Sequence, residues 1–347
     1  MTEAEEVSFR RIIEESEKRA GTVKVFTVYG KRIAFKTNSP AVEREMSQDL
    51  KNFADGSKGE RDVTVYGFLE TRKRLNALAR PPPGAILVWK SLDHSQVHYQ
   101  LDDTVIMYHT KDEKIVAVTL TFNSHDSTVC FSSERNVLYE LCLFEVEKRA
   151  AKLLEKEGKR LLHASSVEMD GRGLLFPATS GFGKTFLTLV LLNNGHRLLS
   201  DDKTFVDPDR MMIFPYSRRL RVDRRSVALF PALRPNLRSQ ERRFLNYKAK
   251  YFIDAEKAWP GSRGSVCPLG CIIFPTVWVN AESRLVPCRI ELALSRLLTS
   301  MKLFHQELTR EETQAALELA TRVPSYNLLI GTDISGIEKA IRTGIKS

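Results

Sequence analysis

Eight consecutive residues near the middle of the chain have the types and order needed to bind phosphate. The segment 178–185 has the sequence ATSGFGKT and lies between a short apolar run at 173–176 and a longer apolar run that begins at Phe186. A buried strand, a glycine-containing loop and a helix in this order are typical of a nucleotide-binding phosphate loop. Alanine stands at position 178, where the consensus has its first glycine.

The residues of this loop have distinct expected parts in binding. Gly181 and Gly183 let backbone N–H groups turn inward around phosphate oxygens, and the helix N-terminus adds partial positive charge. Lys184 is expected to reach the β- and γ-phosphates, and Thr185 to place its hydroxyl on Mg²⁺. The predicted nucleotide-binding residues are Ala178, Thr179, Ser180, Gly181, Phe182, Gly183, Lys184 and Thr185.

Two acidic residues follow the next predicted strand. The helix after the loop is expected to stop at 193–195, and the run HRLLSDD to form a short strand that ends in Asp201 and Asp202. Because the corresponding strand ends of a parallel α/β sheet share one edge, both carboxylates should face the metal and the γ-phosphate of the nucleotide. One carboxylate can then coordinate the metal while the other accepts a proton.

The spacing around the loop resembles that of HPr kinase/phosphorylase, a family whose core is shared with ATP-dependent phosphoenolpyruvate carboxykinase. Members carry a histidine fifteen residues before the loop, where His163 stands here, and paired acids sixteen residues after the loop hydroxyl, where Asp201 stands. The resemblance is tightest over 163–202. It implies an α/β fold with an HPr-kinase-like P-loop catalytic domain, ATP and Mg²⁺ as cofactors, and transfer of the γ-phosphoryl group to a hydroxyl of Ser type.

The resemblance also guides the expected roles of the site residues. Asp201 is predicted to act as general base toward the acceptor hydroxyl, with His163 orienting it and Lys184 neutralising the transferred phosphoryl group. Asp202 and Thr185 are predicted to hold Mg²⁺. The family's EIRGLGI-type signature is not visible after Asp202. We therefore expect a kinase that acts on a protein, peptide or small molecule, without assigning HPr as the target.

Arg218 and Arg219 are candidates for a clamp on phosphate or acceptor, because a guanidinium group binds oxyanions in a bidentate way. They open a basic window, 218–250, with eleven Lys or Arg residues against two acidic ones in a chain of formal charge +10. Such a window suits an anionic partner, and a solvated surface is the equal alternative. We expect nucleotide as a partner and do not expect nucleic acid.

Two other functions stay open at this level. One is a nucleotide-sensing or assembly protein that binds ATP without transferring phosphate, and the intact pair Asp201 and Asp202 argues against it. The other is a carboxykinase-like enzyme that acts on a small carboxylic acid. The chain of 347 residues is shorter than expected for that family, and we find no second metal-binding set of Lys and His residues.

The rest of the sequence predicts the elements that position this site. Short β-branched and aromatic runs separated by turn residues predict a β-rich N-terminal module over 1–137, arranged as an antiparallel meander. Apolar residues at helical spacing follow over 138–157, which we interpret as a connecting helix. Strands interleaved with a helix then predict the α/β catalytic domain over 158–347.

The composition indicates a globular protein. The chain is 42% hydrophobic, and no stretch approaches the roughly twenty apolar residues of a membrane span. Its beginning lacks the pattern of a signal peptide, and its five cysteines are odd in number and scattered. We therefore expect free thiols, a cytoplasmic location and no membrane partner. The resemblance leaves a homo-oligomer open.

Overall fold

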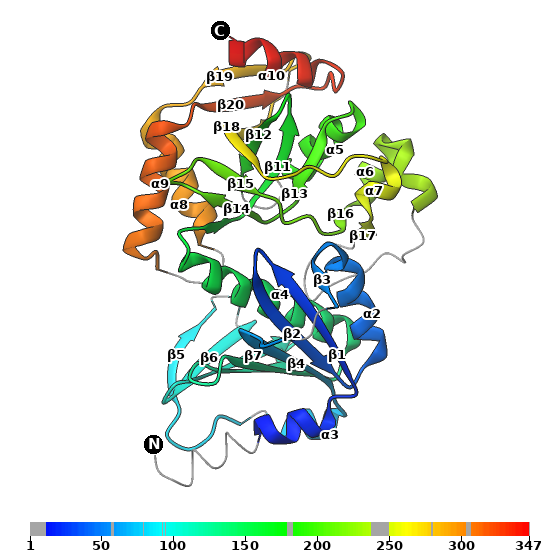
Figure 1. Cartoon of the computed structure of the whole chain (residues 1–347), viewed down its shortest axis with the longest axis vertical. Coiled ribbons are helices and arrows are strands. Elements are labelled where there is room, and N and C mark those ends of the chain that lie inside the picture. Colours follow the sequence, from blue (N-terminus) through cyan, green and yellow to red (C-terminus); the bar gives the residue numbers. More distant parts are fainter. Residues whose placement is uncertain are drawn as a thin grey trace. The chain divides into compact units, whose positions relative to one another are not determined.

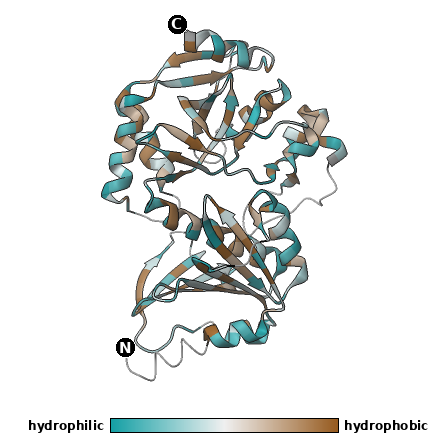
Figure 2. Cartoon of the chain, viewed as in Figure 1, coloured by the Kyte–Doolittle hydropathy of each residue, from teal (hydrophilic) through white to brown (hydrophobic). Residues whose placement is uncertain are grey.

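The computed structural model describes residues 12–56, 59–78, 80–91, 93, 95–178, 183–236, 250–278, 280–302 and 307–346. These residues form two compact units, of which the first ends at Leu153 and the second begins at Leu154 (Figure 1). Each unit is built around a mixed nine-stranded sheet. Figure 2 shows hydrophobic residues on the strands inside each unit and hydrophilic residues along much of α9 (Arg310–Arg322).

The sheet of the first unit has the strand order β3-β1-β2-β4-β9-β8-β7-β6-β5. Its strands are β1 (Thr22–Val28), β2 (Lys31–Thr37), β3 (Ala54–Asp55), β4 (Val63–Leu69), β5 (Ile86–Lys90), β6 (Gln96–Leu101), β7 (Thr104–Lys111), β8 (Lys114–Phe122) and β9 (Ser127–Ser132). Strands β5 to β9 form the predicted antiparallel meander. However, β4 runs parallel to both β2 and β9. The predicted antiparallel sheet is therefore correct only for the meander.

The helix that connects the parallel strands β2 and β4 was not predicted from the sequence. Parallel neighbours need a crossover connection, which α2 (Pro40–Asp49) supplies. Ser39 caps it, its Oγ accepting from the backbone N of Val42 at 3.4 Å, and proline occupies the first turn. A serine followed by proline is a helix-start signal that the sequence contains. In the described part of the chain before β9, the other helical segments are 12–19, η1 (Lys51–Phe53) and α3 (Arg72–Ala77).

The helix α4 (Arg135–Glu155) packs against the sheet of the first unit. Gly67 of β4 approaches it so closely that a Cβ there would lie 2.5 Å from Cys142 Sγ. Arg149 Nε donates to Thr128 Oγ1 of β9 at 3.1 Å. The helix predicted as a connector over 138–157 thus begins three residues earlier, and it belongs to the first unit except for its last two residues.

A buried histidine makes the stability of the first unit depend on pH. Burial lowers the pKa of His109 to about 3, with further contributions from the charges of His98 and Lys148. The unfolded chain, with a histidine pKa of about 6.5, therefore binds one more proton between these two pH values. The free energy of unfolding should fall by about 1.4 kcal/mol for each pH unit of acidification in this window.

This dependence can be measured by urea unfolding at pH 7 and pH 5, followed through Trp89 in a background with Trp259→Phe and Trp278→Phe. His109→Gln, which carries no charge at either pH, should make the slope smaller, whereas the contribution of His98, whose pKa burial lowers to about 4, should remain. His125→Gln removes an exposed histidine of the same unit and should leave the slope unchanged. Equal slopes in the two variants would show that His109 is not the group responsible.

The sheet of the second unit has the order β10-β14-β15-β18-β12-β11-β13, with β20 beside β18 and β19 beside β20. The strands are β10 (Arg160–Leu162), β11 (Ala164–Met169), β12 (Arg172–Pro177), β13 (Arg197–Ser200), β14 (Thr204–Asp207), β15 (Met212–Phe214), β18 (Cys267–Val277), β19 (Arg284–Pro287) and β20 (Ser325–Ile330). Strand β11 is antiparallel to both β12 and β13. Strands β12 and β13 therefore run in the same direction and end at the same edge, although the sheet is not the parallel one expected.

Helices cover both faces of this sheet (Figure 1). Leu174 and Phe176 of β12 pack in one core cluster with residues of α5 and α10, whereas Leu175 packs in a second cluster with residues of α8 and α9. This alternation is what a strand buried on both faces requires. The bounds are α5 (Lys184–Asn193), α8 (Ile290–Met301) and α10 (Gly336–Lys346). None of the helices in the described residues has the length and apolar character that a membrane crossing requires.

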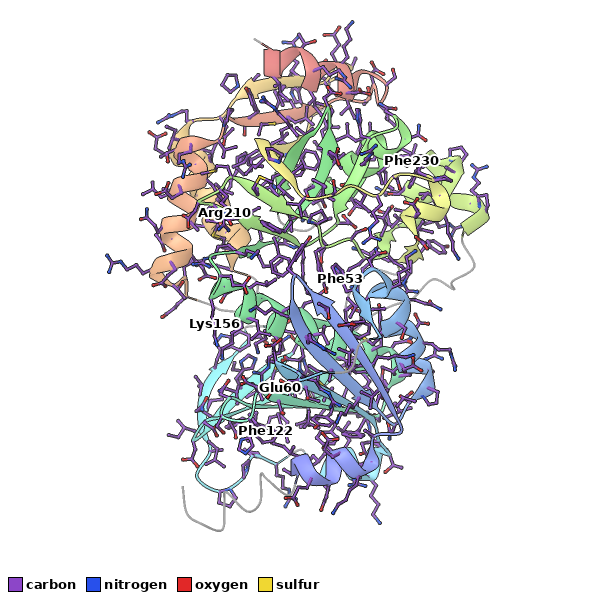
Figure 3. All side chains as sticks on the ribbon, in the orientation of Figure 1. Phe53, Glu60, Phe122, Lys156, Arg210 and Phe230 are labelled. Atoms are coloured by element: carbon purple, nitrogen blue, oxygen red, sulfur yellow. The ribbon has the colours of Figure 1, made fainter. Side chains whose placement is uncertain are left out.

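A smaller group of elements packs against α5. It consists of β16 (Leu220–Val222), α6 (Arg224–Leu229), η2 (Pro231–Asn236), β17 (Tyr251–Ile253) and α7 (Ala255–Ala258). The ring of Phe230, labelled in Figure 3, lies 6.0 Å from the ring of Phe186 in α5, centroid to centroid. Leu220 and Val222 are fully buried in the same core cluster as α5. The basic window thus begins on elements that contact α5.

Candidate functional site

The start of α5 lies at the edge of the sheet where β12 ends at Pro177. Gly183 precedes the helix with a φ of 93°, in the left-handed region that residues with a Cβ rarely adopt. The N–H groups of the first helical turn lack partners within the helix and carry partial positive charge. Thr179, Ser180, Gly181 and Phe182 lie outside the described residues. Of the predicted nucleotide-binding residues, the structure places Ala178, Gly183, Lys184 and Thr185.

Lys184 is buried, and its ammonium group contacts the end of β12 and the ring of His163. Nζ donates to the backbone oxygen of Ala178 and lies 3.0 Å from His163 Nε2. Burial lowers the pKa of Lys184, while the carboxylates of Asp202 and Asp201 oppose the shift. The ammonium group thus lies where the loop leaves the sheet, close to both acids.

Asp201 lies beside the hydroxyl group of Thr185. This carboxylate is buried at the end of β13, and its Oδ1 accepts from Thr185 Oγ1 at 3.2 Å and from Ser165 Oγ at 2.8 Å. From the sequence, Asp202 was predicted to hold Mg²⁺ together with Thr185. In the structure, the carboxylate that contacts the Thr185 hydroxyl is that of Asp201.

Asp202 lies between the imidazole ring of His163 and the guanidinium group of Arg218. Its side chain is 38% exposed; Oδ1 lies 3.4 Å from His163 Nδ1, and Oδ2 lies 3.3 Å from Arg218 Nη2. Burial alone would raise the pKa of Asp202, but His163, Arg218 and Lys203 outweigh it and hold this pKa well below its usual range. The carboxylate is therefore ionised at neutral pH. His163 was predicted to orient Asp201, and its ring contacts Asp202 instead.

His163 lies at the bend between β10 and β11. Its Nδ1 is 3.0 Å from the backbone oxygen of Asp202, which can only accept, so we assign the ring proton to Nδ1. Nε2 then accepts from Lys184 Nζ. Burial lowers the pKa of His163, although the charge of Asp202 opposes the shift, so the ring is neutral at pH 7. The histidine links Lys184 to Asp202.

Ser165 is a site residue that the sequence analysis missed. Its Oγ donates to Asp201 Oδ1 and accepts from the backbone N of Asp202 at 3.3 Å. It thereby supports the turn at Asp202, whose φ of 72° lies in the left-handed region that Asp and Asn tolerate better than most residues. Ser165 stands two residues after His163, so in an extended chain both side chains project to the same side. This spacing is the signal that could have identified it.

Comparisons with known proteins show a distant structural resemblance. No protein-family model matches the chain. No curated protein sequence is significantly similar to it. Among solved structures, the HPr(Ser) kinase/phosphatase from Coxiella burnetii matches 53% of this chain and 89% of its own chain, with 14% sequence identity and a TM-score of 0.30. A match with this TM-score supports no inference about activity.

The two arginines predicted as a clamp have different surroundings. Arg218 is buried and contacts Asp202, as described. The guanidinium group of Arg219 lies 5.0 Å above the ring of Phe252. The segment before them is anchored to the end of β13, because the backbone N of Tyr216 donates to Ser200 Oγ at 2.7 Å. Of the two, Arg218 is the one that the structure brings to the paired acids.

Proposed function

We propose that the second unit binds a nucleoside triphosphate with Mg²⁺ at the start of α5 and transfers its terminal phosphoryl group to a hydroxyl. One observation carries this proposal: the ammonium group of Lys184, the hydroxyl of Thr185 and the carboxylates of Asp201 and Asp202 meet at one edge of the sheet. Phosphoryl transfer needs these groups together, because it depends mainly on positioning and on neutralising the charge of the phosphates.

The residues present fit a nucleotide-bound magnesium ion. Thr185 Oγ1 and Asp201 Oδ1, 3.2 Å apart, are the hard oxygen donors that Mg²⁺ prefers. Within the part of the chain that the structure describes, no group of three or more His, Cys, Asp and Glu side chains is arranged to hold a metal by itself. Magnesium in kinases is commonly held by one or two carboxylates together with substrate phosphates. We therefore assign the metal to Thr185 and Asp201.

Asp202 is then the carboxylate available to the acceptor, because its side chain is partly exposed. Bound MgATP would supply the phosphoryl group: the acceptor oxygen bonds to the γ-phosphorus, the bond to the β,γ-bridging oxygen breaks, and ADP leaves. Asp202 accepts the proton that the acceptor oxygen loses, while His163 and Arg218 hold the carboxylate in place. Lys184 places its positive charge on the phosphates. Most of the expected rate acceleration comes from this positioning.

The low pKa of Asp202 favours a second candidate function. A carboxylate whose pKa is held low by a neighbouring guanidinium group such as that of Arg218 is a weak proton acceptor. In a nucleotide-sensing protein the same residues would bind the nucleotide without transferring phosphate. A carboxykinase-like activity has no comparable support among the described residues.

Calorimetric titration of the full chain with ADP and with a non-hydrolysable ATP analogue, each with and without Mg²⁺, tests the proposal. We expect Mg²⁺ to strengthen binding, because Thr185 and Asp201 would contact the metal. Incubation with Mg²⁺, γ-labelled ATP and a cell extract should then label an acceptor. Binding without labelling would favour the sensing function, whereas absence of nucleotide binding would contradict both candidates.

A further inference from the structure

A small two-stranded ribbon beside Asp202 carries concentrated positive charge. It is formed by β16 and β17, which pair in antiparallel register with Arg221 opposite Phe252. We define the β16–β17 ribbon as residues 218–222 and 250–253, which include four Lys or Arg residues and no acidic residue. The ribbon contains the first five residues of the basic window, 218–222, and its last residue, Lys250.

The two faces of the β16–β17 ribbon differ in character. Leu220 and Val222 are fully buried in the core of the second unit. Because alternate residues of a strand project to opposite sides, Arg219 and Arg221 project to the other face. Their guanidinium groups lie 5.0 and 5.3 Å from the ring centroid of Phe252. Stacking on one aromatic ring holds both charges on that face.

The ribbon meets the site on the side of Asp202 that is opposite to Lys184. Asp202 Oδ1 lies beside His163, which contacts Lys184, whereas Oδ2 lies beside Arg218 at the start of the ribbon. The positive charges of the ribbon therefore act on the carboxylate that we assign to the acceptor.

These charges exceed what the nucleotide requires. In the proposed site, Lys184, the N-terminus of α5 and a bound Mg²⁺ would face the phosphates. The acceptor hydroxyl must approach Asp202, whose second oxygen faces the ribbon. We infer that the β16–β17 ribbon binds an anionic group of the phosphoryl acceptor, so that the phosphorylated hydroxyl lies close to a carboxylate or phosphate. This inference rests on the proposed kinase function of the same site.

Four acceptors presented to the full chain with Mg²⁺ and γ-labelled ATP test the preference. They are a serine peptide flanked by aspartates, the same peptide flanked by lysines, glycerol 3-phosphate and glycerol. We expect the anionic member of at least one pair to be labelled about tenfold faster than its partner, since a charge-assisted hydrogen bond contributes about one factor of ten or more. A preference within the peptide pair would indicate a peptide acceptor, and a preference within the glycerol pair would indicate a small phosphorylated molecule.

Equal or faster transfer to the lysine-flanked peptide and to glycerol would overturn the inference. Transfer to none of the four, with MgADP binding intact, would also overturn it while leaving the nucleotide site standing. Loss of MgADP binding in the wild-type chain would instead contradict the proposed function. MgADP binding by the wild-type chain therefore distinguishes a failure of this inference from a failure of the proposed function.

Charge-removing variants locate the effect. Arg219→Gln with Arg221→Gln should raise the KM for the preferred acceptor about tenfold or more, while the Kd for MgADP stays within about twofold. Arg219→Lys with Arg221→Lys should restore part of the loss, because it retains charge without the planar fork. Arg224→Gln with Arg225→Gln removes two exposed charges just outside the ribbon and should leave the KM unchanged.

The Tm of each variant and its Kd for MgADP report on folding, since the glutamines also remove contacts with Phe252. A rise in the Kd for MgADP of the Arg219→Gln and Arg221→Gln variant, without a rise in the acceptor KM, would assign the ribbon to the nucleotide. An equal rise in the acceptor KM of the Arg224→Gln and Arg225→Gln variant would show that general surface charge, not the ribbon, causes the preference. Either result would overturn the inference.

Discussion

Lys184→Met is expected to abolish measurable phosphoryl transfer while leaving the second unit folded. The ammonium group is the cation that the structure places at the end of the loop, against Ala178 and His163. Losing a charge-assisted contact to phosphate should weaken nucleotide binding by about 10–10² fold. Because the same charge would stabilise the transition state, its loss should lower kcat by about 10²–10³ fold in addition.

Folding should survive this substitution because methionine has nearly the length of lysine. Burial lowers the pKa of Lys184, so its charge is held at a free-energy cost that methionine removes. We expect the Tm to change by about 5 °C or less, the scale of one to two kcal/mol in a unit of this size. Calorimetry, turnover and a thermal melt on the same preparation measure all three quantities.

Lys159→Met is the matched control for Lys184→Met. Lys159 is similarly buried in the second unit and pairs with Glu157 at 2.9 Å, away from the paired acids. Its replacement should leave nucleotide affinity and turnover unchanged. Wild-type turnover by Lys184→Met, or an equal loss in both variants, would remove the basis for placing the phosphate site at the start of α5.

Asp201→Asn and Asp202→Asn are expected to fail in different ways. Asp201 lies against Thr185, so its neutral amide should raise the Mg²⁺ concentration needed for half-maximal activity, by about tenfold or more. Asp202 faces the acceptor in our proposal, so Asp202→Asn should keep nucleotide and Mg²⁺ affinity. Its kcat should fall by about 10²–10⁴ fold, the usual contribution of a positioned base.

The backbone makes asparagine the appropriate substitution at position 202. The φ of 72° there suits Asp and Asn, whereas alanine would add strain and confuse loss of charge with loss of structure. Titrations of Mg²⁺ at fixed ATP, and of ATP at saturating Mg²⁺, separate the two effects. Identical Mg²⁺ dependence in the two variants would contradict the division of roles, and undiminished transfer by Asp202→Asn would show that the reaction needs no carboxylate there.

The sequence alone located the helix α5, the glycine before it and the pair of acids after β13. Local chemistry determines these features: glycine permits the left-handed backbone at Gly183, and the apolar run after it can form a helix that buries one side. The expected meeting of Lys184, Thr185 and the acids at one sheet edge also follows from short segments in order. It did not depend on a parallel sheet, because β11 lies between β12 and β13 and is antiparallel to both.

Only the tertiary structure decided which acid faces which partner. Asp201 and Asp202 are adjacent and identical in type, so no local pattern distinguishes them. The distinction comes from contacts made across more than thirty positions of the chain, from Ser165 to Asp201 and from His163 to Asp202. The β16–β17 ribbon is decided in the same way, because Arg219 and Phe252 meet only when β16 and β17 pair. Residue types can be recognised in a sequence, whereas the direction of a side chain depends on packing between segments that the sequence separates.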